Sequence, residues 1–387
     1  MQDMNYPPIL DVLDPASEEE VKKIILSGNS KSCGLDPIPT YLLKSAIETL
    51  LPVLTKIMHN SLTSANVPQT LKAATVTPLL KKSTLSKEDL KNYRPVSNLP
   101  YLSKVVEKVV VKRLNTHMSQ HHLHEYYQSA YRMFHSIETA LTRVHSDILQ
   151  SLDQRKCVYL VLLDQSAAFD TVDYNILLSR LQHSVGVEGR ALQWFVSYFG
   201  ERTQSIQILG TPSVPRALPC GMPQGSVIGP YGFPIYSAPV ANICRKHGIA
   251  CHFYADDSQL YLQFDPKDEE VALQRLEACI ADVREWMRLN HLKLNDSKTE
   301  FLVIGSPAQR KGLHTESIRI GDASIAATTS ARNIGAIFDC SMTMQEHVNA
   351  MCRSCYCHIR SLGRIRHSLT KDASVNLVHA FISSRLD

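Results

Sequence analysis

The most strongly patterned segment of the chain is residues 157–163, where seven apolar residues stand in a row. The run contains several residues with high β-propensity and stops abruptly at Asp164. Such a run predicts a strand that is buried on both faces and ends at a functional edge of a sheet.

A second pattern predicts a β-hairpin followed by a helix. Two strand-like runs, 251–255 and 258–264, are separated only by Asp256 and Asp257. Apolar residues then recur at steps of three and four, which predicts a long amphipathic helix packed on a sheet. These residues are Leu273, Leu276, Ile280, Val283 and Met287.

Caps and helix breakers predict the remaining elements. Ser17 and Glu20 form a capping box in which each side chain satisfies the other residue's backbone amide, so a helix should run to about residue 26. The other predictions are a loop over 31–39, a helix from Thr40 into the fifties, a strand over 76–80, a helix over 102–114, and two helices within 344–385 on either side of Gly363. This irregular interleaving favours an α+β fold over a doubly wound sheet.

Composition places few limits on the fold. With 387 residues, of which 44% are hydrophobic and 20% charged, the chain can form one large domain or two to three subdomains. No apolar run approaches the roughly 18 residues of a membrane helix, and no secretory signal opens the chain. We therefore expect an intracellular protein, nuclear or cytoplasmic, whose ten cysteines are thiols rather than disulfides.

The net charge of +4 becomes informative once it is located. Residues 351–387 hold six basic and two acidic side chains and so account for the whole excess. A basic C-terminal element suits contact with a phosphate backbone, and a solvated helix face is the alternative. The cysteines at 352, 355 and 357 lack a second ligand pair at zinc-finger distance, and the histidines at 121, 122 and 124 are best explained as an exposed loop.

Three carboxylates carry the strongest indication of chemistry. Asp164 ends the predicted buried strand, and Asp256 and Asp257 occupy the predicted hairpin turn. If the hairpin returns beside the first strand, about 4.8 Å away, the carboxylates converge. Converged carboxylates repel one another unless cations lie between them, and their oxygens suit Mg²⁺. Two such ions would stabilise the attacking and leaving oxygens in phosphoryl transfer.

Several ordered segments resemble motifs of reverse transcriptases, in particular the LINE-type (non-LTR) retrotransposon enzymes of the jockey and chicken-repeat groups. Residues 253–257 resemble the (F/Y)-x-D-D box, 162–170 the first catalytic box, and 221–230 the P-Q-G-S box. Matches to the finger motifs and the later palm motifs lie at 92–97, 128–132, 294–299 and 333–335. The resemblance runs from about Gly34 to the C-terminus.

The resemblance implies a right-hand polymerase fold with a palm sheet, fingers and a truncated helical thumb. It implies an N-terminal helical extension over 1–65, fingers and palm over 66–338, and a basic partial thumb over 339–387. The endonuclease that accompanies such enzymes is not expected in this sequence. Asp164, Asp256 and Asp257 would be the catalytic metal ligands for two Mg²⁺ ions, with Mn²⁺ as a substitute.

The resemblance also implies roles in substrate binding. The ring of Phe169 would exclude a 2′-hydroxyl, although it could also be a plain core residue. Gln224 and Gly225 would let the backbone approach the template base and the incoming nucleotide. Lys298 would meet the pyrophosphate and donate a proton to it, with an ordinary surface lysine as the alternative.

Other positions are less specific. Arg94 and Arg132 are candidates for binding triphosphate or template phosphate. Asp170 is expected to be structural, and neither Asp173 nor Asp322 is expected to touch metal.

The chain also departs from the family pattern. Pro230, Gly232 and Pro234 stand where the family has an apolar helix, and an interior proline costs about 3 kcal/mol. Ala130-Tyr131 and Gln165 replace the usual residues of their motifs. These departures suggest a copy that has drifted.

The resulting hypothesis is an RNA-directed DNA polymerase that uses an RNA template, a DNA primer and deoxynucleoside triphosphates. Neither a membrane nor an obligate protein partner is expected. One alternative is a catalytically inactive, retrotransposon-derived fragment that at most binds nucleic acid. Another is an RNA-templated RNA polymerase, against which Phe169 argues.

Overall fold

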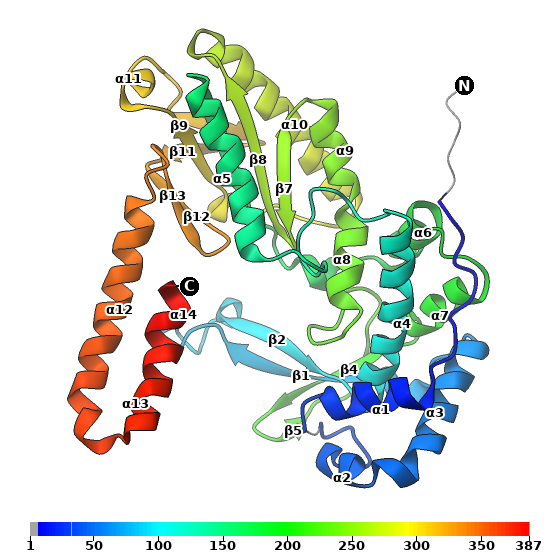
Figure 1. Cartoon of the computed structure of the whole chain (residues 1–387). Coiled ribbons are helices and arrows are strands. Elements are labelled where there is room, and N and C mark those ends of the chain that lie inside the picture. The colour runs from blue at the N-terminus through cyan, green and yellow to red at the C-terminus, as the bar shows by residue number, and fades with distance from the viewer. Residues whose placement is uncertain (1–6, 32, 387) are drawn as a thin grey trace, which may run out of the picture. The chain divides into compact units, whose positions relative to one another are not determined.

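The computed structural model describes residues 7–31 and 33–386, and residues 1–6 of the expected N-terminal extension, Ser32 and Asp387 lie outside the described part (Figure 1). Its contacts divide the chain into two compact units. The first consists of Met1–Met133, Gln165–Ile243 and Val283–Leu294, and the second of Phe134–Asp164, Cys244–Asp282 and Asn295–Asp387. Two helices, α9 (Pro239–Lys246) and α10 (Glu269–Leu289), contribute residues to both.

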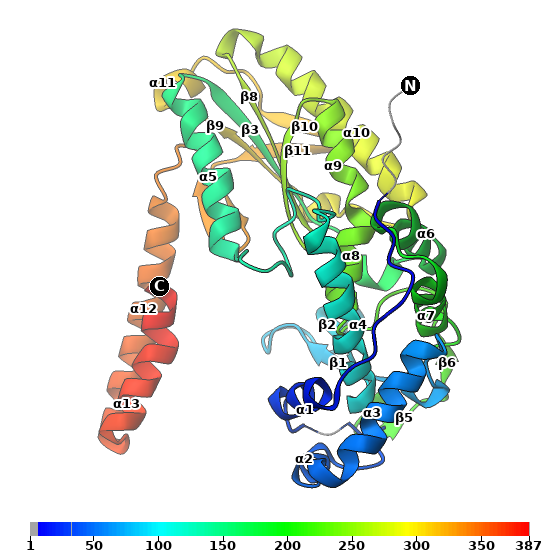
Figure 2. The ribbon, with the colours of Figure 1, turned by 45° about the vertical axis from the view of Figure 1, so that its right-hand side comes forward.

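The second unit is built on a six-stranded sheet in the order β10-β11-β9-β3-β8-β7. The strands are β3 (Cys157–Leu163), β7 (Ala250–Tyr254), β8 (Asp257–Phe264), β9 (Glu300–Ile304), β10 (Ser317–Ile320) and β11 (Ala323–Thr328). β3 pairs antiparallel with both β8 and β9, and all seven of its residues are buried, as the sequence predicted. Helix α5 (Ile137–Asp153) lies along one face of the sheet and α10 along the other (Figure 2).

The core of this unit forms where α5 meets the sheet. Val144 and Ile148 of α5 pack with Val158, Leu160 and Leu162 of β3, and all five are buried. Each such side chain contributes about 1.5–3 kcal/mol to folding through burial. A two-stranded sheet closes the same core, formed by β12 (Ser330–Asn333) and β13 (Ala336–Asp339), and the short α11 (Pro307–Arg310) follows β9.

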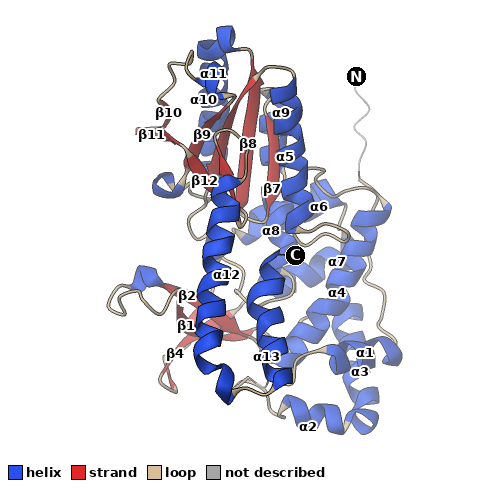
Figure 3. Cartoon of the chain, turned by 60° about the vertical axis from the view of Figure 1, so that its left-hand side comes forward, coloured by secondary structure: helices blue, strands red, loops and turns tan. Residues whose placement is uncertain are grey.

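The C-terminal helices are α12 (Gln345–Ile365) and α13 (Lys371–Val378), both labelled in Figure 3, and α14 (Ser384–Leu386), labelled in Figure 1. A π-helical turn, His379–Ser383, precedes α14. The two predicted helices are present, but the break between them lies after Ile365 and not at Gly363, which is inside α12. The chain turns only afterwards, and Thr370 caps α13 by accepting a hydrogen bond from the Ala373 amide at 3.2 Å. None of the helices that the structure describes is long and apolar enough to span a membrane.

The first unit combines helices with a second sheet in the order β2-β1-β4-β5, to which β6 pairs through β4. The predicted strand over 76–80 and the helix over 102–114 are confirmed, whereas the helix expected from Thr40 is interrupted at Ala46. The elements are α1 (Glu18–Ser27), α2 (Thr40–Ser45), α3 (Ile47–Thr63), β1 (Ala73–Leu80), β2 (Tyr93–Asn98), α4 (Tyr101–Gln120), α6 (Tyr174–Val185), α7 (Gly189–Phe199), β4 (Thr203–Ile208), β5 (Thr211–Pro212), β6 (Arg216–Ala217) and α8 (Gly229–Ser237).

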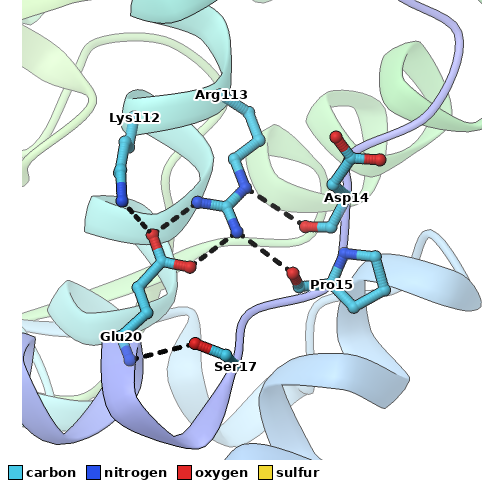
Figure 4. A network of polar contacts seen from close by, with 6 residues as sticks. All are labelled: Asp14, Pro15, Ser17, Glu20, Lys112 and Arg113. Atoms are coloured by element: carbon cyan, nitrogen blue, oxygen red, sulfur yellow. Dashed lines mark hydrogen bonds and ion pairs between the residues drawn. The ribbon is translucent and has the colours of Figure 1, made fainter.

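The predicted capping box of α1 is only half right. Ser17 Oγ accepts a hydrogen bond from the Glu20 amide at 3.2 Å, as expected. The Glu20 carboxylate instead accepts two hydrogen bonds from Arg113, at 2.6 and 2.7 Å, and one from Lys112 at 2.7 Å (Figure 4). Two cations of α4 outcompete a single neutral amide for the carboxylate.

Pro234 and Gly232 both lie inside α8, which is the placement for which the sequence predicted a cost. Burial of Phe233 and Tyr236 in this helix offsets the lost backbone hydrogen bond. A Cβ at 232 would lie 2.4 Å from Met222 Cε, so a larger residue there would require the end of the Met222 side chain to shift. Gly232 is therefore a packing feature of this fold.

Candidate active site

The hairpin that carries Asp256 and Asp257 lies in the second unit, between β7 and β8. Tyr254 pairs with Asp257, so Ala255 and Asp256 alone form the turn and Asp257 is the first residue of β8. Ala255 has the left-handed φ of 57° that a tight hairpin turn requires. The predicted hairpin is confirmed, but the prediction that Asp257 lies in the turn is wrong.

Asp164 lies directly after β3, at the same end of the sheet. Leu163 pairs with Ser258, and continuing this register places Asp164 opposite Asp257 on the adjacent strand. Burial and then the Asp164 charge raise the pKa of Asp256. Desolvation, followed by the charges of Asp256 and Asp164, raises the pKa of Asp257 to about 6, although part of this residue is open to solvent. The three carboxylates are thus close enough to repel one another.

Two side chains from the segment before β9 hold the Asp164 carboxylate. Lys298 Nζ donates to Asp164 Oδ2 at 3.1 Å, and Asn295 Nδ2 donates to the same oxygen at 3.2 Å. The Asn295 amide also donates to the Asp164 carbonyl at 2.9 Å. Lys298 was predicted as a site residue, whereas Asn295 was missed as a contact of Asp164, although it stands within the motif at 294–299.

The donor set fits divalent cations. The three carboxylates repel one another, and the pKa values of Asp256 and Asp257 are raised. A hard cation with oxygen ligands relieves such repulsion. Among the described residues, no three His, Cys, Asp or Glu side chains are already arranged as a metal site. The Lys298 ammonium meanwhile compensates part of the negative charge at Asp164.

A second group of predicted site residues gathers in the first unit. Gln224 Nε2 donates to both carboxylate oxygens of Asp170, at 3.2 and 3.4 Å, and the Gln224 carbonyl accepts from the Ser97 amide at 2.8 Å. Gly225 has a φ of 129°, and a Cβ there would lie 2.5 Å from the Ser97 carbonyl oxygen. Asp170, expected to be structural, orients the Gln224 amide. Neither this contact nor the one made by Ser97 is evident from the local sequence.

Phe169 lies in the same unit and is half-buried. Its ring lies 5.0 Å from that of Phe233, at an angle of 30° between the ring planes. Its carbonyl accepts from the Met222 amide at 2.7 Å, which ties Phe169 to the Gln224 loop.

Arg94 and Arg132 belong to the first unit as well. Arg94 is exposed on β2, and Arg132 donates to the Glu125 carbonyl at 3.3 Å. In the described part of the chain, neither has a hydrogen bond or ion pair to Gln224 or Gly225. Asp173 caps α6 by accepting from the amides of Asn175 and Ile176, which gives it a structural role.

The basic residues of the C-terminal segment are exposed on α12, α13 and the elements that follow them. They are Arg353, Arg360, Arg364, Arg366, Lys371 and Arg385. The cysteines at 352, 355 and 357 lie within α12, as predicted for a helix, with Cys355 buried and the other two exposed.

Comparison with known proteins identifies the family. The reverse transcriptase (RNA-dependent DNA polymerase) family matches residues 80–337, which is two thirds of the chain. The probable RNA-directed DNA polymerase from transposon BS of Drosophila melanogaster is 27% identical over 360 residues, covering 90% of this chain and 38% of the relative. The RNA-directed DNA polymerase from mobile element jockey of Drosophila funebris is 24% identical over 384 residues, covering 96% of this chain and 41% of the relative.

A third relative comes from another type of retrotransposon. The putative 115 kDa protein in type-1 retrotransposable element R1DM of Drosophila melanogaster is 25% identical over 348 residues, which is 89% of this chain and 32% of the relative. The chain therefore spans about two fifths or less of the length of these three relatives. On the match over residues 80–337, the chain belongs to the reverse transcriptase (RNA-dependent DNA polymerase) family.

Proposed function

We propose that this chain is an RNA-directed DNA polymerase, which extends a DNA primer on an RNA template with deoxynucleoside triphosphates. The observation that carries the proposal is the approach of Asp164 to Asp256 and Asp257 at one end of adjacent strands. The family match and the names of the relatives support the same reaction.

The proposed architecture is that of a right-hand polymerase. The six-stranded sheet would be the palm, the sheet containing β1 and β2 would belong to the fingers, and the helices from α12 onward would form part of a thumb. The corresponding boundaries are an N-terminal extension over 1–65, fingers and palm over 66–338, and the partial thumb over 339–387.

Asp164, Asp256 and Asp257 would hold two Mg²⁺ ions, or Mn²⁺ in their place. Such ions lower the pKa of a primer 3′-hydroxyl and neutralise a departing pyrophosphate. Asn295 would keep the Asp164 carboxylate oriented through its hydrogen bond at 3.2 Å. Lys298, now paired with Asp164 at 3.1 Å, is the cation in this group that could meet the pyrophosphate and donate a proton to it.

The residues of the first unit would bind the substrates. Gly225, with no side chain, would let the backbone approach a nucleotide, and Asp170 would hold the Gln224 amide in place. The half-buried ring of Phe169 would reject a 2′-hydroxyl and so select deoxynucleotides. Arg94, Arg132 and the exposed basic residues of α12 and α13 would contact phosphates.

Templated incorporation tests this function. The purified chain is incubated with Mg²⁺ and a labelled DNA primer annealed to RNA templates that differ only in the first unpaired base. We expect addition of the complementary deoxynucleotide on each template and little addition of ribonucleotides. Addition that ignores the template base, or preference for ribonucleotides, would refute the proposal. A folded but inert chain would instead support the inactive fragment.

A further inference from the structure

A buried carboxylate in the first unit lies outside all the groups described so far. Glu107, on α4, is only 1% exposed. Its Oε2 accepts hydrogen bonds from the backbone amides of Val227, at 2.5 Å, and Ile228, at 3.2 Å. Its Oε1 accepts from the hydroxyl of Ser103 at 3.1 Å. Polymerase chemistry, as proposed above, makes no use of this group.

The two backbone amides that donate hydrogen bonds to Glu107 lie in the loop between Gly225 and α8. They follow Gln224 and Gly225 by two to four residues and directly precede α8. Backbone amides before the first turn of a helix lack intrahelical partners, and a buried amide without a partner destabilises the fold. Glu107 therefore satisfies two amides in the loop between Gly225 and α8.

A buried cation lies near this carboxylate. Burial raises the pKa of Glu107, and the charge of Arg202, which is 1% exposed, counters part of that rise. The Arg202 guanidinium is held by a hydrogen bond from Nη1 to the Tyr198 carbonyl at 3.1 Å and lies 4.7 Å from the centre of the Tyr198 ring. A buried carboxylate is costly unless it is hydrogen-bonded, and Glu107 accepts three hydrogen bonds.

We infer that Glu107 is a positioning residue, which fixes the Gln224–Gly225 loop for the nucleotide by anchoring the amides of Val227 and Ile228 to α4. This role deepens the proposed function and rests on it. The other anchors of the loop, at Ser97 and Asp170, act at Gln224 itself, so Glu107 holds the opposite end of the loop.

Hydrogen exchange measured by mass spectrometry tests the anchoring without any need for activity. Glu107→Ala removes both acceptors, so we expect peptides carrying Val227 and Ile228 to exchange about tenfold faster or more. Glu107→Gln keeps an amide oxygen that can accept both bonds and should retain most of the protection. Val110→Ala, a buried truncation on the same helix, controls for general loosening of α4.

Unchanged protection in Glu107→Ala, or equal loosening in Val110→Ala, would overturn the inference. Exchange in Glu107→Gln as fast as in Glu107→Ala would also overturn it, because the charge rather than the acceptor oxygen would then hold the loop. In primer extension, Glu107→Ala should raise the KM for deoxynucleotides about tenfold more than Val110→Ala does, with a smaller change in kcat. An inert wild type would refute the proposed function, whereas the exchange result would still decide the role of Glu107.

Discussion

The Glu20 cluster permits a quantitative prediction about stability, because Glu20 anchors α1 to α4 (Figure 4). Glu20→Gln keeps the shape of the side chain but removes the charge that Arg113 and Lys112 contact. In the folded protein, the hydrogen bond from Arg113 is the largest cause that lowers the Glu20 pKa, from 4.5 to about 2. The variant should therefore be less stable than the wild type at neutral pH.

The shift sets the size and the pH range of this effect. The Glu20 side chain is only 13% exposed, so solvent screening is limited. A shift of this size corresponds to about 3 kcal/mol of unfolding free energy, whereas an exposed ion pair contributes about 0–1 kcal/mol. Because the folded pKa lies below the unfolded one, the contribution is complete above about pH 4.5 and is lost as the pH falls towards 2.

Urea unfolding of the wild type and Glu20→Gln between pH 7 and pH 2.5 measures the difference. Glu19→Gln is the matched control, because Glu19 lies in the same first turn of α1 but is exposed. We expect a loss of about 2–3 kcal/mol for Glu20→Gln at pH 7, a loss of about 0.5 kcal/mol for the control, and convergence of all three proteins at low pH. Equal effects of both variants at pH 7, or a Glu20 effect independent of pH, would refute the reasoning.

Three further predictions concern the candidate site. Phe169→Val should raise the ratio of ribonucleotide to deoxynucleotide incorporation at least about tenfold. A loss of stability without a change in this ratio would show that Phe169 is only a core residue that packs against Phe233. Gly225→Ala should lower the unfolding free energy by about 1–3 kcal/mol, because its Cβ would lie 2.5 Å from a backbone oxygen. Gly210→Ala, where φ is also positive but no atom lies within 4 Å, should cost less, and equal losses in urea unfolding would contradict this account. Asp257→Asn should raise Tm at pH 7 in EDTA, because the pKa of Asp257 is about 6 in the folded protein against a usual 3.8, so its ionised form destabilises the fold. The gain in Tm should vanish below about pH 4, where the wild-type carboxyl is protonated in both states. A gain that persists there would refute the raised pKa of Asp257.

Local patterns in the sequence were sufficient for the elements that carry the candidate metal ligands. The apolar run at 157–163 predicted β3 because a strand buried on both faces needs no polar positions. The paired runs around Asp256 and Asp257 predicted the hairpin for a similarly local reason. The motif at 294–299 supplied Lys298, but not the contact of Asn295 with Asp164.

Features that depend on residues distant in sequence could not be predicted in this way. Glu20 fits a capping box locally, and only the fold brings Arg113 to it across 93 positions. Gly232 resembles a helix breaker until Met222 packs where its side chain would be. Glu107 lies in a helix rich in valine and charged residues, and nothing nearby in the sequence indicates that its partners are Val227 and Ile228.

The central claim is that the carboxylates at the end of β3 and in the β7–β8 hairpin promote nucleotidyl transfer. The most direct test is the rate of single-deoxynucleotide addition on an RNA template with Mg²⁺, compared between the wild type, Asp256→Ala and Asp322→Ala. Asp322, in the turn between β10 and β11, is the exposed control. We predict a loss of at least about a thousandfold for Asp256→Ala, equivalent to about 4 kcal/mol of barrier, and none for Asp322→Ala. Wild-type rates in a folded Asp256→Ala variant would contradict the account.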